Sequence, residues 1–271
     1  MLTTKYELWD NIPGTTNTTP YILHCEPDKK IYDNCLVIFP GSGYSASPSR
    51  PQQEGLDIAE YFCRFGITVF IVEYRVKPDY YPLPILDGRR AMRFIRYNSE
   101  KFGINKEKIA LMGFSAGGHL ASTMSGYFKP LEFESLDDID KESYTPNYQI
   151  LCYPVINMDL DSGFAHPGSA NSLLNTRYEE LKDELCMEKI TSDKIPPTFI
   201  FHNFDDNAVD ITNSLRYAEN LRKLGGTLEM HIFPEGGHGV GICKLDQKDQ
   251  KHAKNWINLL CNWLKYNNFS L

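Results

Sequence analysis

The chain has 271 residues, of which 42% are hydrophobic and 23% charged, and its formal net charge is −7. This is an ordinary globular composition, with enough length for a sizeable hydrophobic core. The acidic net charge and the lack of clustered Lys and Arg argue against nucleic acid as a partner, because the phosphate backbone of nucleic acids is bound by basic surfaces.

The sequence has no features of a membrane or secretory protein. Its first residues, MLTTKYELWDN, lack the basic start and apolar run of a signal peptide. No stretch approaches the roughly 18 apolar residues that span a bilayer. Seven cysteines without C-x-x-C spacing favour reduced thiols over disulfides or a zinc site. We therefore predict a cytoplasmic protein with no membrane partner; the cysteines are Cys25, Cys35, Cys63, Cys152, Cys186, Cys243 and Cys261.

Short apolar runs alternate along the chain with longer amphipathic ones. Most of the apolar runs are continuously hydrophobic, which is typical of parallel strands covered on both faces. The alternation predicts a doubly wound, mostly parallel α/β sheet in a single domain, residues 1–271. The predicted strands are 35–40, 67–74, 108–114, 149–156, 197–202 and 228–233, and the predicted helices are 52–65, 85–101, 116–127, 211–224 and 247–266.

Two segments do not fit this alternation. Residues 128–147 are acidic and broken by prolines, and residues 157–196 contain a short helical stretch at 178–189. The sequence places both after the end of a strand, where α/β enzymes build their sites. We expect them to form cap or pocket elements, and the sequence leaves open whether either moves as a lid.

Residues 113–117, Gly-Phe-Ser-Ala-Gly, fit the pattern G-x-S-x-G. A nucleophile at a tight strand-to-helix turn needs neighbours two residues away that are nearly free of side chains. The turn also places the serine at a helix N-terminus, where free N–H groups favour developing negative charge. Because an apolar strand precedes the motif and a small-residue helix follows it, we identify Ser115 as a nucleophile rather than an incidental turn serine.

A serine nucleophile needs a base, usually His, that is oriented by a carboxylate, and with this motif the chain order is Ser, acid, His. We prefer His238 as the base because it follows the last predicted strand in the glycine-rich loop PEGGHGVGI. His231 lies within a strand, and His119 lies on the helix after the serine, which favours a packing or hydrogen-bonding role. His24 precedes the serine and His252 lies in the predicted terminal helix, so both are interpreted as structural or exposed.

The acid is expected after strand 197–202, where Asp205 and Asp206 are adjacent. Only one of them can face the histidine. We prefer Asp206 because the loop continues as D-x-x-V into the next helix, whereas Asp205 suits a turn or a cap. Asp210 fits the N-cap of the helix that begins at Ile211.

The stretch IFPGSGYSAS, residues 38–47, is the candidate oxyanion hole. Gly41 and Gly43 allow the backbone to curl around an oxygen atom. The expected donors are the N–H groups of Ser42 and Gly43 together with that of Ala116, which follows the nucleophile. An ordinary Gly-Pro turn is the alternative, and the position before the serine strand disfavours it.

The chain resembles the α/β-hydrolase esterase/lipase family in the segments VIFPGSGY, FIVEYRV, YPLPILDGRRAMRFIRYN, KIALMGFSAGGHLAS, CYPVINMD, PPTFIFHNFDDNAVDITNSLRYAENLRKLG and HIFPEGGHG. The nearest branch is that of acetyl-xylan-esterase-like carbohydrate deacetylases, which are related to hormone-sensitive-lipase-type esterases. The resemblance covers residues 36 to 240 in order. It implies an α/β-hydrolase fold and a catalytic triad of Ser115, Asp206 and His238.

One motif departs from the family pattern. The family commonly has P-G-G-G-Y where this chain has P-G-S-G-Y at residues 40–44. Ser42 still offers its N–H group, but we expect its side chain to narrow the pocket and restrict the size of the acyl group. The resemblance also implies that Tyr44 and the 157–175 loop help to line the substrate site.

Three further features each allow two interpretations. Tyr44 is either a face on which a sugar ring stacks or an ordinary surface tyrosine. Arg75 fits a buried ion pair with Asp87 or Glu73 better than a contact with substrate. The acidic run at residues 137–140 fits a solvated loop better than a cation site, because no regular ligand spacing accompanies it.

These observations predict a serine carboxylesterase that cleaves short acyl esters, with acetyl esters of sugars or oligosaccharides as the expected substrates. The predicted mechanism requires no metal and no organic cofactor, and the partner is a small-molecule ester. One alternative is an amide- or peptide-cleaving serine hydrolase of the same fold, of formamidase or prolyl-peptidase type. A second is a catalytically silent binding protein. The sequence leaves open a homo-oligomer.

Overall fold

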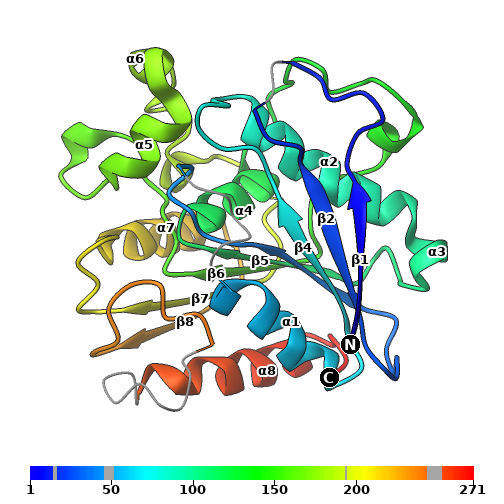
Figure 1. Ribbon diagram of the computed structural model, residues 1–271. Coiled ribbons are helices and arrows are strands. Elements are labelled where there is room, and N and C mark those ends of the chain that lie inside the picture. The colour runs from blue at the N-terminus through cyan, green and yellow to red at the C-terminus, as the bar shows by residue number, and fades with distance from the viewer. Residues whose placement is uncertain (15–16, 46–51, 193, 243–251) are drawn as a thin grey trace.

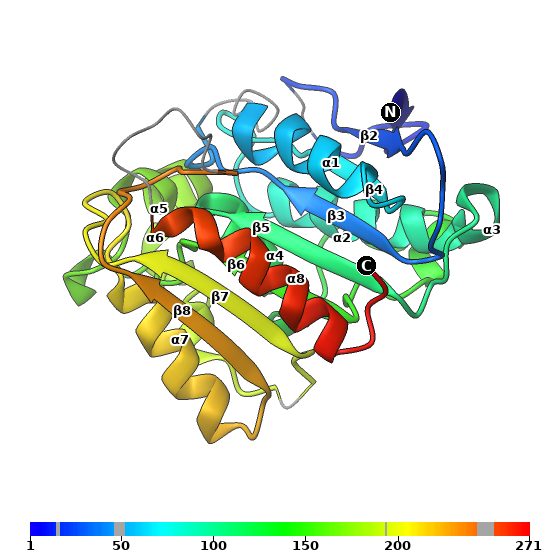
Figure 2. The same cartoon turned by 90° about the horizontal axis from the view of Figure 1, so that it is seen from below.

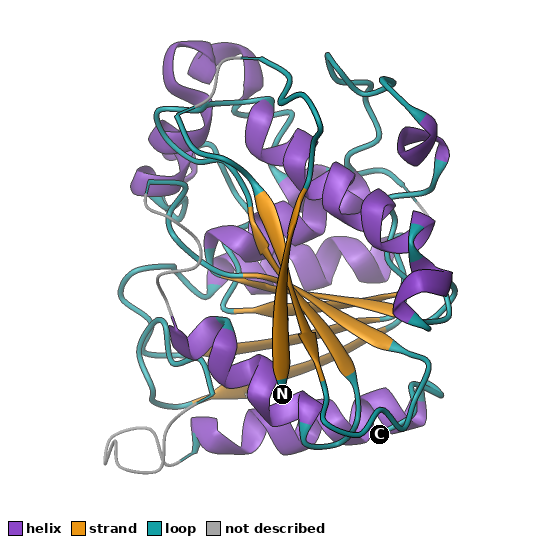
Figure 3. Cartoon of the chain, turned by 45° about the vertical axis from the view of Figure 1, so that its right-hand side comes forward, coloured by secondary structure: helices purple, strands orange, loops and turns teal. Residues whose placement is uncertain are grey.

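The computed structural model describes residues 1–14, 17–45, 52–192, 194–242 and 252–271 (Figure 1). A sheet with the strand order β1-β2-β4-β3-β5-β6-β7-β8 forms its centre, and Figure 3 shows the strands fanning out with the usual twist. Of these eight strands, β2 alone runs against the others, because it is antiparallel to both β1 and β4 while the remaining pairs are parallel. The strands are β1 (Leu2–Glu7), β2 (Tyr21–Glu26), β3 (Cys35–Phe39), β4 (Thr68–Glu73), β5 (Ile109–Phe114), β6 (Tyr148–Cys152), β7 (Thr198–Asn203) and β8 (Leu228–Phe233).

Helices cover both faces of the sheet. Helices α1 and α8 lie on one face, seen from below in Figure 2, and α2, α4 and α7 lie on the other, with α5 and α6 beyond the strand ends. The helices are α1 (Leu56–Cys63), α2 (Leu83–Tyr97), α3 (Ser99–Phe102), α4 (Ala116–Gly126), α5 (Pro167–Leu174), α6 (Tyr178–Leu181), α7 (Thr212–Lys223) and α8 (Trp256–Tyr266). The predicted α/β architecture is therefore confirmed.

The central strands are apolar throughout because each divides its side chains between two cores. In β3, Val37 and Phe39 belong to the core under α2 and α4, whereas Leu36 and Ile38 belong to the core under α1 and α8. All five residues of this strand are buried. Successive side chains of a strand point to opposite faces, so a strand covered on both sides needs an apolar residue at every position.

The predicted and observed elements differ in several places. Strands β1 and β2 were not predicted, because they form the antiparallel edge of the sheet and β1 is exposed at most positions. The predicted helix at 85–101 is divided into α2 and α3 at Asn98. Helix α8 begins at Trp256, so the placement of His252 inside that helix is wrong: it lies in a turn before it. Residues 247–251 of the prediction lie outside the described residues.

The two inserted segments lie in different places. Residues 128–147 follow helix α4 rather than a strand, so the expectation that both segments follow a strand end is wrong for this one. Residues 157–196 do follow β6 and contain α5, which was not predicted. Helix α5 begins with Pro167, and His166 before it accepts the N–H of Ser169, so a His-Pro start is the signal that was overlooked.

Candidate active site

Ser115 occupies the sharp turn between β5 and α4, with φ +52° and ψ −119°. Two glycines make this turn possible. A Cβ atom on Gly113 would lie 2.3 Å from the carbonyl oxygen of Gly117, and one on Gly117 would lie 2.0 Å from that of Phe39. Both approaches are too close for any side chain, which explains the G-x-S-x-G pattern in physical terms.

The structure brings the predicted serine, histidine and aspartate into contact. The Nδ1 atom of His238 lies 2.7 Å from Oδ2 of Asp206, and its Nε2 atom lies 2.8 Å from Oγ of Ser115. Because the carboxylate can only accept, Nδ1 carries the proton and donates it. The lone pair on Nε2 then faces the Ser115 hydroxyl, which is the arrangement that a general base requires.

Asp206 is held as an ionised carboxylate by its surroundings. Burial opposes its ionisation, but hydrogen bonds from His202 and His238 outweigh burial and lower the pKa of the carboxyl well below its ordinary value. The other oxygen, Oδ1, accepts the N–H groups of Ala208 and Val209 at 2.9 and 3.0 Å. A carboxylate with this many donors stays charged and keeps the imidazole in one orientation.

His238 lies in a loop after β8, here called the His238 loop (residues 234–242). Asp205 holds the start of this loop by accepting the N–H groups of Gly236 at 3.2 Å and Gly237 at 2.9 Å, and Asn203 donates to the carbonyl of Gly237 at 2.8 Å. The predicted turn role of Asp205 fits these contacts. Asp206 therefore orients the ring of His238, and the adjacent Asp205 fixes the His238 loop.

Residues 41–45, here called the oxyanion turn, begin beside Ser115, because a Cβ atom on Gly41 would lie 2.9 Å from the Cβ of Ser115. The N–H of Ser45 donates to the carbonyl of Ser42 at 3.1 Å, and Gly43 and Tyr44 both have positive φ, +61° and +56°. No described residue accepts a hydrogen bond from the N–H of Ser42, Gly43 or Ala116. The hydrogen bonds of the described residues therefore leave these three N–H groups free, and their role as donors to an oxygen atom bound at Ser115 stays a prediction.

Tyr44 does not have the environment that was predicted. Its side chain is fully buried, so it is neither a surface tyrosine nor a free face for a sugar ring. Its hydroxyl lies 2.9 Å from Nδ1 of His119, whose Nε2 lies 2.8 Å from the carbonyl oxygen of Leu185. Because a carbonyl only accepts, Nε2 carries the proton and Nδ1 accepts from Tyr44. Burial lowers the pKa of His119 to about 4, so this bridge is neutral.

The side chain of Ser42 turns away from solvent. Its Oγ atom is buried and forms no hydrogen bond with a described residue. The hydroxyl of Tyr74 donates to the carbonyl oxygen of Pro40 at 2.7 Å, just before the oxyanion turn. The restriction of acyl size by Ser42 stays a prediction.

Three residues near this site were missed in the sequence. His202 lies 3.2 Å from Asp206 through Nε2, and its position at the end of the predicted strand 197–202 was a usable signal. The ring of His166 lies 3.9 Å from the position that a Cβ on Gly43 would take. Glu54 accepts the N–H of Gly41 at 2.8 Å, and no local pattern marks it.

The other predicted contacts divide into confirmed and corrected ones. Arg75 and Asp87 form the expected buried ion pair, with two hydrogen bonds of 2.8 Å from the guanidinium to the two carboxylate oxygens. The acidic run at 137–140 is a solvated segment only in part: Asp137 and Asp138 are exposed, but Asp140 is buried, and Asp137 and Asp140 both accept hydrogen bonds from Arg90. The Arg90 guanidinium thus supplies the positive charge that a bound cation would supply in the alternative interpretation of this run as a cation site.

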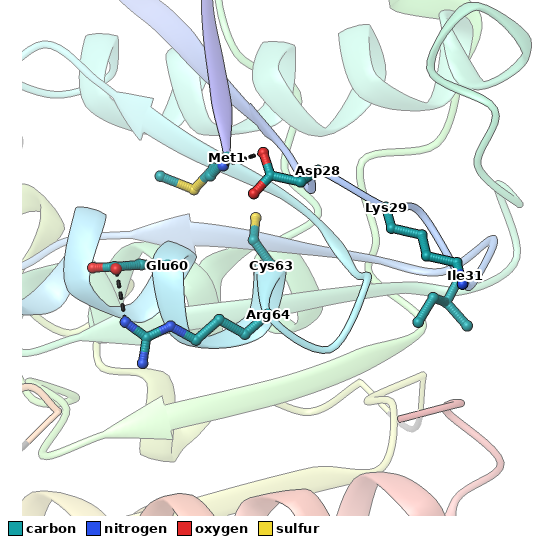
Figure 4. A pocket seen from close by; sticks show the side chains of 7 residues that line it. All are labelled: Met1, Asp28, Lys29, Ile31, Glu60, Cys63 and Arg64. Atoms are coloured by element: carbon teal, nitrogen blue, oxygen red, sulfur yellow. Dashed lines mark hydrogen bonds and ion pairs between the residues drawn. The ribbon is translucent and has the colours of Figure 1, made fainter.

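A separate hollow of about 530 Å³ lies near the amino ends of the central strands (Figure 4). Two pairs of its charged groups are in contact: the N-terminal amine with Asp28 at 2.6 Å, and Arg64 with Glu60 at 2.7 Å. Burial raises the pKa of the Cys63 thiol to about 12, so this sulfur is not a ready nucleophile. The hollow contains none of the groups that chemistry at Ser115 would need.

The described part of the chain offers few other functional features. Within it, no group of three or more His, Cys, Asp or Glu side chains is placed to hold a metal ion. No helix in the same ranges has the length and apolar character to cross a membrane. The six described cysteines are free and five of them are buried, and Cys243 lies outside the described residues.

The sheet order, the serine on a strand-to-helix turn, and the acid and histidine on later loops define an α/β hydrolase. Comparison with known proteins then gives the family: the BD-FAE family model matches residues 23–221, and the chain belongs to the BD-FAE family. The predicted resemblance is confirmed at this level.

Curated relatives and solved structures agree with this assignment. The chain is 31% identical over 235 residues to "Acetylxylan esterase" of Xylanibacter ruminicola, covering 85% of this chain and 45% of that protein. It is 32% identical over 215 residues to "Endo-1,4-beta-xylanase B" of Butyrivibrio fibrisolvens, covering 77% and 33%. The chain thus spans less than half the length of these relatives. A solved acetyl ester-xyloside bifunctional hydrolase from Caldicellulosiruptor lactoaceticus matches with a TM-score of 0.87 and 35% identity, covering 98% of this chain and 97% of that one.

Proposed function

We propose that this protein is a serine carboxylesterase that hydrolyses short acyl esters through an acyl-enzyme. His238 takes the proton of Ser115 through Nε2, and the serine oxygen attacks the ester carbonyl. The N–H groups of Ser42, Gly43 and Ala116 stabilise the negative oxygen that develops. The alcohol leaves with the proton from His238, and a water molecule then cleaves the acyl-enzyme by the same route.

The single observation that carries this proposal is the alignment of Ser115, His238 and Asp206 by hydrogen bonds of 2.8 and 2.7 Å. An unassisted serine hydroxyl is a poor nucleophile, and this alignment supplies its base. Asp206 keeps Nδ1 protonated and stabilises the imidazolium that forms during the reaction. A binding protein would have no need for both of these contacts.

We further propose acetyl groups on sugars or short oligosaccharides as the substrate class. The names of the Xylanibacter ruminicola and Caldicellulosiruptor lactoaceticus proteins support acetyl esters of xylose-based sugars. We place the enzyme in the cytoplasm because its described cysteines are free, and there it would meet imported short sugars rather than a polymer. The proposal treats residues 1–271 as one catalytic domain, which the single eight-stranded sheet supports.

Substitution of the nucleophile tests the reaction. Ser115→Ala is expected to lower kcat on p-nitrophenyl acetate by at least about 10⁴-fold, because base and acid cannot act without the serine oxygen. A fluorophosphonate probe should label the wild-type chain at Ser115. Turnover by the variant within tenfold of wild type would refute the mechanism.

Two further comparisons complete the same experiment. Asp206→Asn should lower kcat far more than Asp205→Asn, because only Asp206 fixes the tautomer of His238. A panel of acetylated xylo-oligosaccharides, p-nitrophenyl esters and aminoacyl amides separates esterase from amidase activity. Faster cleavage of the amides would assign the protein to the amide-cleaving class, and failure of Ser115 to be labelled would favour a silent binding protein.

A further inference from the structure

A buried carboxyl group lies directly behind the oxyanion turn. Glu54 is 4% exposed; its Oε2 accepts the N–H of Gly41 at 2.8 Å, and its Oε1 accepts the hydroxyl proton of Tyr153 at 2.8 Å. Burial raises the pKa of this carboxyl above its ordinary value, and the hydrogen bonds from Tyr153 and Gly41 offset this effect only in part. Burial of a carboxyl group costs free energy that burial of an apolar side chain would not cost. The two groups that it contacts, Gly41 and Tyr153, therefore indicate what Glu54 does at this position.

The first partner, Gly41, is held between Glu54 and the nucleophile. A Cβ atom on Gly41 would lie 2.9 Å from Oε2 of Glu54 and 2.9 Å from Cβ of Ser115. The N–H of Gly41 is used by the carboxylate, so it is not offered to a substrate oxygen. The bond therefore sets the direction in which the next two N–H groups, those of Ser42 and Gly43, can point.

The second partner, Tyr153, contacts the base and its loop. Its hydroxyl accepts the N–H of Gly241, at the far end of the His238 loop, at 3.0 Å. Its ring lies against the imidazole of His238, edge to face, with centroids 5.0 Å apart. Gln53, next to Glu54, donates to the carbonyl oxygen of Gly239 in the same loop at 2.5 Å. Hydrogen bonds thus run without a break from the oxyanion turn to the loop that carries the base.

We propose that Glu54 and Tyr153 are a pair of positioning residues that hold the oxyanion turn and the His238 loop at a fixed separation around Ser115. The inference rests on the proposed esterase function. Electrostatic stabilisation depends on donors that are already in place when the oxyanion forms, and an error of about 1 Å costs on the order of 100-fold in rate. The pair lies behind the site and does not touch the substrate, so its loss should act on kcat and leave KM nearly unchanged.

The test uses Tyr153→Phe, Glu54→Gln and Glu54→Ala, with Tyr217→Phe as the matched control. Tyr217 is also a fully buried tyrosine, and its hydroxyl accepts a hydrogen bond of 2.8 Å from Gln149, away from Ser115. For each variant, kcat and KM on p-nitrophenyl acetate, the rate of fluorophosphonate labelling and the melting temperature are measured. Glu54→Gln keeps an acceptor for Gly41, whereas Glu54→Ala leaves that N–H buried and unpaired.

We expect kcat and the labelling rate to fall about tenfold in Tyr153→Phe and Glu54→Gln and about 100-fold in Glu54→Ala, with KM within about threefold of wild type. The melting temperature of Tyr217→Phe should fall by about as much as that of Tyr153→Phe, while its kcat stays at the wild-type value. The proposal is overturned if the folded Tyr153→Phe variant keeps kcat within twofold, if KM alone changes, or if Tyr217→Phe loses as much activity. Should the Glu54 variants not fold, Tyr153→Phe decides alone. A wild-type chain that is inactive and unlabelled would instead remove the esterase function itself.

Discussion

Residues 128–147 and residues 157–196 both interrupt the alternation of strands and helices, but they leave the fold at different points. The first segment leaves the end of helix α4 and lies against α2. The second leaves the end of β6, next to the turn that carries Ser115. Because ligands of parallel α/β sheets bind at the carboxyl ends of the strands, the second segment is placed to contact a substrate and the first is not.

The first segment is held by a row of arginines on one face of α2. Arg93 lies three or four residues from each of Arg89, Arg90 and Arg96, and residues at this spacing lie on the same side of a helix. Three carboxylates and several carbonyl oxygens of the segment accept their hydrogen bonds, so its acidic character serves packing. The contacts join Arg89 to Lys129 and Glu134, Arg90 to Asp137 and Asp140, Arg93 to Glu134 and Glu142, and Arg96 to Ser143 and Thr145.

The second segment contacts the oxyanion turn at two points. The ring of His166 lies beside Gly43. The carbonyl of Leu185 accepts a hydrogen bond from His119, which in turn holds the hydroxyl of Tyr44. Both contacts reach the turn that we assign to oxyanion binding. The role of an inserted segment therefore depends on the element that it follows, a helix or the carboxyl end of a strand. Its acidic or proline-rich composition does not decide that role.

The largest expected effect on stability concerns the arginine row. Arg90→Met should lower the free energy of unfolding by about 3–5 kcal/mol, because it leaves the buried Asp140 with only the more distant guanidinium of Arg93, at 3.9 Å. This loss corresponds to roughly 10 °C in melting temperature for a chain of this length. Activity of the folded variant should stay within about twofold of wild type. Denaturant unfolding and initial rates measure the two effects.

An exposed ion pair provides the control for this substitution. Arg216 and Glu219 pair at 3.1 Å on the surface of α7, so Arg216→Met should cost less than about 1 kcal/mol. A clear loss of kcat in Arg90→Met at unchanged fold would break the comparison, since segment 128–147 would then influence the site.

The sequence was sufficient for the site residues that local physics constrains. Gly113 and Gly117 flank Ser115 because no side chain fits at either position, and that requirement leaves a readable pattern. The continuous apolar runs of the central strands follow from burial on both faces. His238 and Asp206 could be found because the fold requires them after particular strands.

Other features depend on contacts between distant residues, so no local pattern records them. Glu54 meets Tyr153, which lies 99 residues away, and Tyr44 meets His119, which lies 75 residues away. Burial of Tyr44 could not be read from a tyrosine in a glycine-rich turn. Strand β1 has an alternating, mostly polar sequence that suits an exposed edge, so it lacked the apolar run used to find the others.

The next effect is a loss of stability on acidification. It concerns His119, which joins segment 157–196 to the oxyanion turn. The pKa of His119 is about 4 in the folded protein, against an ordinary value of 6.5. Between these values the unfolded chain binds more protons, so the free energy of unfolding falls as the pH drops from about 6.5 to 4. The difference corresponds to about 3 kcal/mol.

A variant that cannot titrate tests this link. His119→Gln can still accept from Tyr44 and donate to Leu185, so it should fold and lose this part of the pH dependence. Other titrating groups are common to both proteins and cancel in the comparison. Equal slopes of unfolding free energy against pH for the two proteins would contradict a buried neutral His119 and would weaken the second contact of segment 157–196.

The smallest effect sharpens the comparison at His166. Its Nδ1 accepts the N–H of Ser169 at 3.2 Å, so the proton is on Nε2, which forms no hydrogen bond with any other described residue. Burial lowers the pKa of His166, which favours a neutral ring that can donate beside Gly43. A free N–H at this place suits a contact with an oxygen of the substrate.

Two substitutions separate that contact from the capping of helix α5. His166→Asn keeps an acceptor for Ser169 but cannot reach into the site, whereas His166→Ala loses both functions. If the ring contacts substrate, both variants should lower kcat/KM on acetylated xylo-oligosaccharides about tenfold, equivalent to about 1.4 kcal/mol, and only His166→Ala should lose about 1 kcal/mol of stability. If His166→Asn restores kcat/KM as well as stability, His166 is only a helix cap. Segment 157–196 would then support the oxyanion turn from behind, and the two segments would differ in what they hold in place rather than in whether they meet the substrate.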